Sequence, residues 1–338
     1  GAEFADAEDI KFLSSTAGSG PLLVLTANRV KSLQRSLRQG WPAATIALAA
    51  HHYEQLFNLA FGQTRLGDND GLSLVAERSG SLADHATRLL RNAKLLPAAL
   101  MARLPFRDIV VQDRFAQEHN ILVLEARDLE SYHHQAGAMM RIAARARVPL
   151  AVAEDAEVVM FRAEIGGEDH FAVLIGKGTK LEAPLVRLHS QCITGDVLGS
   201  LKCDCGNQLQ AAMELMAKNG GGVLIYLAQE GRDIGLLNKM RAYALQDNGL
   251  DTVDANHALG FDTDERVFLP AARILDALGI TRLRLITNNP DKISQLEQCG
   301  IKVEERVPLT LASNPHNKDY LATKKNRTGH MIADKDNR

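Results

Sequence analysis

The chain has 338 residues, with 39 basic and 41 acidic side chains and a formal net charge of −2. This near balance of charge gives no electrostatic reason to expect a nucleic-acid partner or an anionic membrane surface. Hydrophobic residues make up 46% of the chain, which is enough for two buried cores, and no apolar run is long enough to span a bilayer.

The N-terminal half is expected to form one domain. Residues 22–25 are predicted as a strand, residues 30–39 and 53–60 as helices, and residues 115–128 as a helix followed by a strand. The opening Gly1-Ala2-Glu3-Phe4 lacks an initiator Met and is interpreted as an expression-vector remnant, and no signal peptide is expected.

Strands and helices alternate in the C-terminal half. An apolar run at 223–227 follows three glycines and predicts a buried strand, preceded by a helix with apolar positions at 209, 213 and 216. The sequence further predicts helices at 234–246, 268–278 and 291–298, and strands at 282–286 and 301–307. This alternation predicts an α/β domain. The polar, aperiodic tail at 324–338 is expected to be mostly disordered.

Three of the four cysteines lie close together: ten residues separate Cys192 from Cys203, and one separates Cys203 from Cys205. Structural zinc sites are normally closed by four protein ligands, whereas catalytic sites keep one position open for water. No fourth ligand stands at a structural spacing, since His189 is the nearest candidate and Cys299 is far along the chain. The pattern therefore predicts a catalytic zinc site, and the alternative is a set of buried or free thiols. So few cysteines favour a reducing compartment, which we expect to be the cytoplasm.

The stretch at 148–321 resembles GTP cyclohydrolase II, which opens the guanine ring of GTP in the first committed step of riboflavin biosynthesis. Eight motifs in a fixed order carry the resemblance: Arg187-Leu188-His189-Ser190-Gln191-Cys192, Ser200-Leu201-Lys202-Cys203-Asp204-Cys205-Gly206, Gln229-Glu230-Gly231-Arg232-Asp233-Ile234-Gly235-Leu236, Ala242-Tyr243-Ala244-Leu245-Gln246, Ala255-Asn256-His257, Leu259-Gly260-Phe261, Asp264-Glu265-Arg266, and Thr287-Asn288-Asn289-Pro290 with Lys292. The resemblance implies hydrolysis of GTP with release of formate and pyrophosphate, leaving 2,5-diamino-6-(5-phosphoribosylamino)pyrimidin-4(3H)-one.

The same resemblance implies the catalytic roles. Asp264 would accept a proton, Tyr243 would donate one near the ring, and a zinc ion held by the three cysteines would carry the attacking water. Arg266 would act at the α-phosphate, either as the nucleophile proposed for the family or as a clamp. The second role fits a guanidinium better, because it stays protonated and has no free lone pair.

A nucleoside triphosphate carries about four negative charges, so its site needs cations and backbone donors, with Mg²⁺ on the phosphates. The resemblance assigns GTP contacts to Arg187, Leu188, His189, Ser190, Gln191, Gln208, Glu230, Gly231, Arg232, Thr252, Thr287 and Lys292. Gln191, Asn207 and Asp233 depart from the commonest form of the family pattern, which bears on nucleotide affinity rather than on the reaction type. A homodimer is expected.

The N-terminal half resembles 3,4-dihydroxy-2-butanone-4-phosphate synthase, mainly through residues 101–105 and 115–124. That enzyme needs an acidic metal-binding run after its first strand, but here the place reads Thr26-Ala27-Asn28-Arg29-Val30-Lys31, without a carboxylate. The domain is therefore expected to be non-catalytic. His85 is expected to be a surface histidine, and the alternative is a relic of the synthase's metal-binding histidine. The sequence thus predicts two α/β domains, a degenerate synthase-like one at 5–145 and a cyclohydrolase domain at 146–323, with the tail beyond.

Two other functions stay open. The chain could be a zinc-bearing scaffold or regulator without catalysis, or a related hydrolase acting on a nucleotide ring in another pathway. The presence of Tyr243, Asp264 and Arg266 favours a working enzyme over a scaffold.

Overall fold

A computed structural model describes residues 1–18, 20–62, 71–135, 139–164 and 168–331. The chain divides into two compact units. Unit 1 comprises Gly1–Ser131 together with Leu237–Glu265, and unit 2 comprises Tyr132–Leu236 together with Arg266–Arg338. The units therefore cut across the expected division near residue 145, because a segment within the cyclohydrolase-like stretch packs with the N-terminal half.

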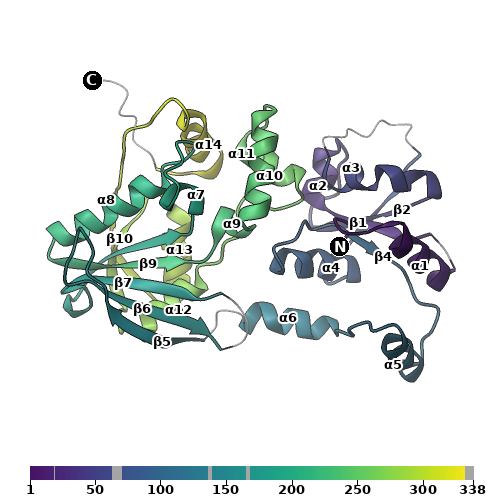
Figure 1. Ribbon diagram of the computed structural model, residues 1–338, viewed down its shortest axis with the longest axis horizontal. Helices are drawn as coiled ribbons and strands as arrows, with labels where there is room; N and C mark the ends of the chain where they lie inside the picture. Colours follow the sequence, from purple (N-terminus) through teal and green to yellow (C-terminus); the bar gives the residue numbers. More distant parts are fainter. Residues whose placement is uncertain (19, 63–70, 136–138, 165–167, 332–338) are drawn as a thin grey trace. The chain divides into compact units, whose positions relative to one another are not determined.

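Unit 1 contains, among its described residues, a four-stranded antiparallel sheet in the order β3-β2-β1-β4 (Figure 1). Helix α4 packs on this sheet through Ala83 and Leu90, which contact Val24, Ala43 and Ala99. The elements are α1 (Ala7–Ala17), β1 (Leu22–Thr26), α2 (Ala27–Ser32), β2 (Ala43–Ala47), the 3₁₀ helix η1 (Ala50–Gln55), α3 (Leu56–Phe61), β3 (Leu74–Glu77), α4 (Leu82–Asn92), β4 (Ala99–Met101), α5 (Ile109–Glu118), α6 (Ala126–Gln135), α10 (Leu236–Asp247) and α11 (Thr252–Ala258).

Several expectations for the N-terminal half are wrong. The helix expected at 30–39 ends at Ser32, because Gln34 adopts a left-handed conformation (φ +63°) that stops helical hydrogen bonding. No strand forms between α5 and α6, where all residues are described, and the apolar side chain of Leu122 is 91% exposed. His85 is buried in α4, with Nε2 3.8 Å from Glu130 Oε1. Glu3 pairs with Arg241 of α10 at 2.9 Å, while the origin of the opening residues stays a prediction from the sequence.

Unit 2 is built on a mixed sheet of seven strands among its described residues, in the order β11-β10-β8-β9-β7-β6-β5 (Figure 1). Strands β11, β10, β8 and β9 are parallel, and β7, β6 and β5 continue the sheet in antiparallel fashion. The elements are β5 (Met140–Arg147), β6 (Glu157–Ala163), β7 (His170–Gly176), η2 (Gly178–Lys180), β8 (Leu185–Ser190), α7 (Ile193–Asp196), α8 (Cys205–Lys218), β9 (Gly221–Leu227), α9 (Glu230–Asp233), α12 (Leu269–Ala277), β10 (Arg282–Ile286), α13 (Pro290–Gln298), β11 (Lys302–Val307) and α14 (Lys318–Thr328).

Helices cover both faces of this sheet. Val186 and Leu188 point to the face covered by α12 and α13, whereas Leu185 points to the face covered by α8. Since side chains alternate along a strand, Arg187 and His189 share the α8 face with Leu185. Both faces are apolar, as expected for strands buried between helices.

Most of the expected elements of the C-terminal half are confirmed, with α8, β9, α10, α12, β10, α13 and β11 within a few residues of their predicted bounds. The expectation of a disordered tail is wrong for its first residues, because residues 324–328 form the end of α14. Residues 332–338 lie outside the described part. In the part of the chain that the structure describes, no helix is long and apolar enough to cross a membrane. The expectation of an α/β fold is confirmed.

Candidate metal and nucleotide site

The cysteine cluster lies where the parallel strands of unit 2 end. Cys192 follows β8, Glu230 follows β9 and Thr287 follows β10. In open α/β sheets, ligands commonly bind outside the carboxyl ends of the strands, at the point where the strand order reverses. The chain passes from β8 to β9 on one side of β8 and then to β10 on the other side, so the end of β8 is such a point.

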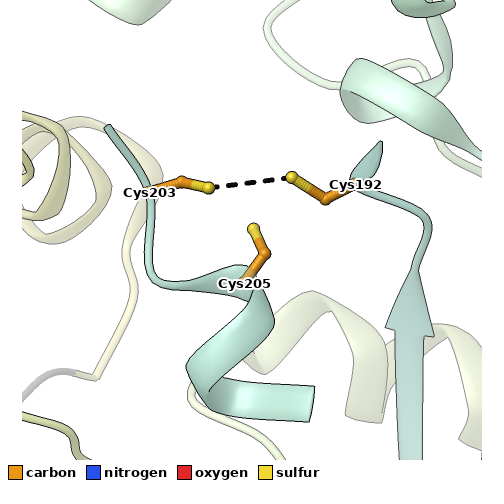
Figure 2. A group of neighbouring side chains, drawn as sticks. All are labelled: Cys192, Cys203 and Cys205. Atoms are coloured by element: carbon orange, nitrogen blue, oxygen red, sulfur yellow. Dashed lines mark hydrogen bonds between the residues drawn. The ribbon is translucent and has the colours of Figure 1, made fainter. Parts of the chain in front are cut away.

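The three thiols converge on one point, as Figure 2 shows. Cys192 precedes α7, Cys203 lies in the connection to α8, and Cys205 is the first residue of α8. Their sulfur atoms all lie within 4.8 Å of one another, with Cys192 Sγ and Cys203 Sγ 3.7 Å apart. Sulfurs bound about 2.3 Å from a tetrahedral zinc ion are about 3.8 Å apart. The cluster thus has the spacing of a metal-thiolate site.

The surroundings of the thiols also fit a cation. Hydrogen bonds to Cys192 and Cys203, together with burial, raise the pKa of the Cys205 thiol well above its usual value. Three thiolates this close would repel one another strongly, so their ionisation requires a cation between them. Among the described residues, no fourth ligand of the kinds that bind metals joins the cluster.

Asp196 organises the backbone around the cluster. Its Oδ2 accepts hydrogen bonds from the Cys192 amide at 3.0 Å and from the Tyr226 hydroxyl at 2.9 Å. His189 Nε2 lies 3.0 Å from the same oxygen, so the nearest histidine faces Asp196 rather than the thiols. Burial lowers the pKa of His189 even though Asp196 opposes this effect. His189 is therefore held in place by Asp196, in surroundings whose burial disfavours its charged form.

A polar chain links the metal site to the C-terminal helix. Arg187 Nη2 donates to Gln208 Oε1, and Gln208 Nε2 donates to Asp204 Oδ2. Lys324 of α14 donates to Asp204 Oδ1 at 2.9 Å. Burial alone would raise the pKa of Asp204, but the charge of Lys324 and its hydrogen bond hold it below the usual value. In the described part of the chain, Arg187 Nε is buried without a hydrogen-bond partner, which leaves a donor available at the site.

Glu230 and the turn after it close another side of the site. Glu230 Oε2 accepts from the Ile193 amide at 2.6 Å and Oε1 from the Gly231 amide at 3.0 Å. Gly231, Arg232 and Asp233 all have positive φ, of 66°, 60° and 74°. Left-handed non-glycine residues cost free energy and occur where function requires the backbone geometry.

Arg266 and several residues that were assigned to GTP in unit 2 gather around the end of β8. Arg266 Nη1 donates to Ser190 Oγ at 3.3 Å, and Lys292 Nζ donates to Leu188 O at 2.7 Å. The Gln191 amide bonds to Leu227 O, and the Thr287 hydroxyl accepts from the Asn289 amide. The side chain of Leu188 is buried in the core, so only its backbone is polar here.

Three predicted site residues belong to the other unit. Tyr243 lies in α10, Thr252 begins α11, and Asp264 is an exposed residue in the loop after α11. Lys239 Nζ lies 5.7 Å from the centre of the Tyr243 ring.

Sequence reasoning missed Asp196, Gly195 and Lys324. Asp196 stands four residues after Cys192, and a carboxylate at that distance from a metal ligand was a usable signal. Gly195 packs against all three cysteines, since a Cβ there would lie 2.9 Å from Cys203 Sγ. Nothing in the sequence indicated Lys324, because it lies in a polar segment without periodicity.

The comparisons with known proteins concern both halves of the chain. A family model described as GTP cyclohydrolase II matches residues 140–308. A GTP cyclohydrolase-2 of Azospirillum brasilense is 45% identical over 329 residues, which cover 96% of this chain and 84% of that protein. A GTP cyclohydrolase-2 of Proteus mirabilis is 51% identical over 193 residues, covering 57% of this chain and 96% of that protein.

Two further matches involve longer or two-domain proteins. A riboflavin biosynthesis protein RibBA of Salinispora tropica is 42% identical over 264 residues, covering 76% of this chain and 66% of that protein. A crystal structure of RibBX, a two-domain 3,4-dihydroxy-2-butanone 4-phosphate synthase from A. baumannii, matches 92% of this chain and 90% of that one. Its TM-score of 0.34 and identity of 17% are too low to support a structural argument. On the family match and the relative that spans almost the whole chain, this protein belongs to the GTP cyclohydrolase II family of hydrolases.

Proposed function

We propose that the protein hydrolyses GTP, opening the imidazole ring with release of formate and pyrophosphate to leave 2,5-diamino-6-(5-phosphoribosylamino)pyrimidin-4(3H)-one. This is the first committed step of riboflavin biosynthesis. The observation that carries the proposal is the convergence of Cys192, Cys203 and Cys205 at the end of β8, beside Arg187. A metal site and a buried cation at the carboxyl ends of parallel strands suit a hydrolase that acts on a nucleotide.

Cys192, Cys203 and Cys205 would hold one zinc ion. When bound, zinc supplies a Lewis acid and lowers the pKa of a coordinated water. Three thiolates offset the charge of the ion, so the protein has to supply a proton acceptor and a donor of its own. We assign these roles to Asp264 as acceptor and Tyr243 as donor near the ring, as in the family.

The phosphates would be bound by cations. Arg266 lies at the end of β8 through its bond to Ser190, and we assign it to the α-phosphate. Because a guanidinium stays protonated near neutral pH, its chemistry suits a clamp that stabilises charge during transfer. Arg187, Arg232 and Lys292, with Mg²⁺, would bind the remaining phosphate charge.

The guanine would be recognised through hydrogen bonds with groups at the strand ends. We assign this recognition to Gln208 and Glu230, with lesser contacts from Thr252 and Thr287. Arg187 Nε supports a pocket at this place, because a buried donor without a protein partner is suited to a ligand. A homodimer and a cytoplasmic location stay predictions from the sequence.

The purified protein should be incubated with GTP and Mg²⁺ while formate, pyrophosphate and the diaminopyrimidine are measured in one reaction. We expect all three in equal amounts and about one zinc ion per chain. Cys203→Ser should lose zinc and ring opening while its circular dichroism is unchanged. Cys299→Ser, outside the cluster, is the matched control and should keep both.

The same reaction separates the other functions. Bound zinc without GTP consumption would indicate a scaffold or regulator, and turnover of a different nucleotide in a substrate panel would indicate a related hydrolase. Active protein without zinc or any other transition metal would refute the proposed chemistry.

A further inference from the structure

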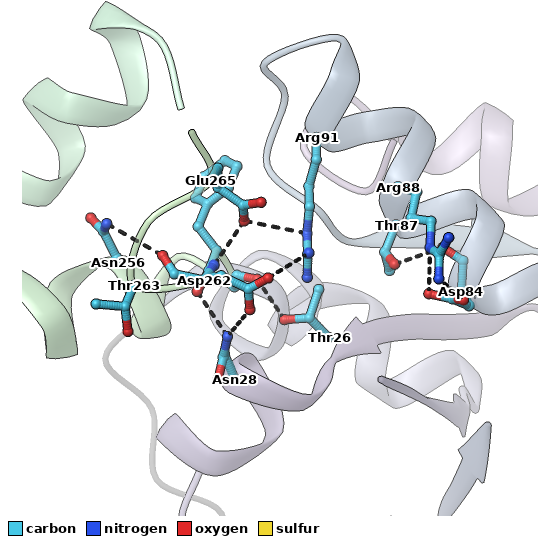
Figure 3. A network of polar contacts seen from close by, with 12 residues as sticks. Thr26, Asn28, Asp84, Thr87, Arg88, Arg91, Asn256, Asp262, Thr263 and Glu265 are labelled. Atoms are coloured by element: carbon cyan, nitrogen blue, oxygen red, sulfur yellow. Dashed lines mark hydrogen bonds and ion pairs between the residues drawn. The ribbon is translucent and has the colours of Figure 1, made fainter. Parts of the chain in front are cut away.

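The N-terminal segment of unit 1 contacts a loop of the same unit that carries a predicted catalytic residue. The 258–265 loop follows α11 and contains Asp264, and it is contacted by Thr26, Asn28, Arg29 and Arg91, here called the N-terminal contact residues. Figure 3 shows three of them: Thr26 lies near Arg91, Asn28 points toward Asp262, and Arg91 of α4 reaches Asp262 and Glu265.

Three of the contacts fix the backbone of the loop. Thr26 Oγ1 donates to Gly260 O at 2.7 Å, Asn28 Nδ2 donates to Phe261 O at 3.0 Å, and Arg29 Nη1 donates to Ala258 O at 3.0 Å. Gly260 has a φ of +87°, and a Cβ there would lie 3.2 Å from Thr26 Oγ1. The loop therefore approaches β1 and α2 as closely as a glycine permits.

Charges hold the loop on both sides of Asp264. Arg91 Nη1 lies 2.9 Å from Asp262 Oδ2, and Arg91 Nε lies 3.6 Å from Glu265 Oε1. Asn28 Nδ2 donates to Asp262 Oδ1 at 2.6 Å, and the Asp262 amide donates to Glu265 Oε1 at 2.8 Å. Asp264 thus lies between two anchored carboxylates.

The buried side chain of Arg29 strengthens the attachment of the 258–265 loop to the N-terminal segment. Its side chain is 2% exposed, and besides Ala258 O it donates to the carbonyls of Leu59 and Asn58. Burial lowers the pKa of Arg29 to about 10, so the side chain is still charged near neutral pH. Loss of one acceptor would leave a buried cation incompletely hydrogen-bonded, which strongly destabilises the folded state.

We propose that the N-terminal segment of unit 1 positions Asp264 through the N-terminal contact residues. Three of them, Thr26, Asn28 and Arg29, stand where the sequence resemblance leads one to expect a metal-binding acidic run. The inference rests on the proposed function of the loop. The two uses of this surface exclude each other, because carboxylates at positions 26–31 would repel Asp262 and Glu265. Asn28 and Arg91 are positioning residues, since they act through the loop rather than on the substrate.

The test compares Arg91→Ala with Arg88→Ala in the full chain, with zinc content and thermal midpoint measured for each. Arg88 lies on the same helix, one turn earlier, and pairs with Asp84 at 2.8 Å, so its removal is the matched control. We expect Arg91→Ala to lower kcat for formate release about tenfold with KM for GTP unchanged, because a small displacement of a catalytic group mainly slows chemistry. Arg88→Ala should keep the kcat of the wild type.

Two further variants distinguish positioning from loss of stability. Asn28→Asp keeps the shape of the side chain but places a carboxylate beside Asp262, so it should lower kcat while its circular dichroism and zinc content stay those of the wild type. Arg91→Ala combined with Asp262→Ala should lose less than the sum of the two single losses, because both changes break the same Arg91–Asp262 contact.

Equal kcat values for Arg91→Ala, Asn28→Asp and Arg88→Ala would overturn the inference, as would fully additive losses in the double variant. A wild-type protein that does not consume GTP would instead overturn the proposed function, so the two failures can be told apart.

Discussion

Gly195 leaves no room for a side chain beside the metal site. A Cβ at this position would lie 2.9 Å from Cys203 Sγ and 3.1 Å from Cys192 Sγ. In an ordinary helix, replacing glycine by alanine stabilises by about 1 kcal/mol. We expect the opposite for Gly195→Ala, with zinc affinity reduced at least about tenfold, because sulfurs held by a metal cannot move away.

Competition with a chelator of known affinity measures the effect of Gly195→Ala. Leu198→Ala, in the same turn but with a 72% exposed side chain, is the control and should bind zinc like the wild type. Unchanged zinc affinity in Gly195→Ala would show that the cluster can spread without loss, contrary to the packing described.

Arg266 and Tyr243 are predicted to have separable roles. Arg266→Ala should reduce pyrophosphate and formate release together, because both depend on the α-phosphate contact. Tyr243→Phe keeps the aromatic packing and removes only the hydroxyl, so it should reduce formate release more than pyrophosphate release. Both products should be measured in one reaction. Equal, small losses of both products in Tyr243→Phe would remove the ring-specific role from its hydroxyl.

At the scale of elements, α14 is tied to the metal site by one buried ion pair. Asp204 is 6% exposed and lies next to two of the cysteines, and Lys324 pairs with it at 2.9 Å while lying 4.5 Å from the centre of the Tyr320 ring. Removing one partner of a buried pair leaves an uncompensated charge. We expect Lys324→Met to destabilise unit 2 by about 2 kcal/mol, which lowers its thermal midpoint by about 6 °C.

Lys324→Met should also raise KM for GTP, since Asp204 is linked through Gln208 to Arg187. Differential scanning calorimetry and steady-state kinetics measure the two effects. Lys325→Met changes the exposed neighbour on the same helix and serves as control. If the two variants behave alike, α14 is not held by the ion pair with Asp204.

For the whole molecule, we predict that the N-terminal half has no activity of the synthase that it resembles. The chain should not convert ribulose 5-phosphate to dihydroxybutanone phosphate, because the place after β1 holds Thr26, Asn28 and Arg29, and all three bond to the 258–265 loop. No carboxylate remains there to hold Mg²⁺. A coupled assay with Mg²⁺ present measures this, and turnover above that of a heat-treated sample would contradict it.

The sequence determined most of what depends on local pattern. Hydrophobic periodicity and glycine placement predicted α8, β9, α12, β10 and α13, because buried side chains recur every few residues along each of these elements. The cysteine spacing predicted the cluster, since a short connection keeps three ligands near one another. The same reasoning failed after α5, where an apolar run predicted a strand, but no strand of the described residues lies beside it to pair with it.

Only the tertiary structure decided which distant segments meet. The sequence pattern placed residues 237–265 in the cyclohydrolase half, yet in the structure they pack with the N-terminal segment and form unit 1 with it. Their acceptor atoms pair with the donors of Asn28, Arg29 and Arg91. Lys324 looked like part of a disordered tail, and its place became definite only through Asp204, 120 residues earlier. Hydrogen bonds and ion pairs of this kind carry no periodic signal along the chain, because their partners are set by the fold and not by spacing in the sequence.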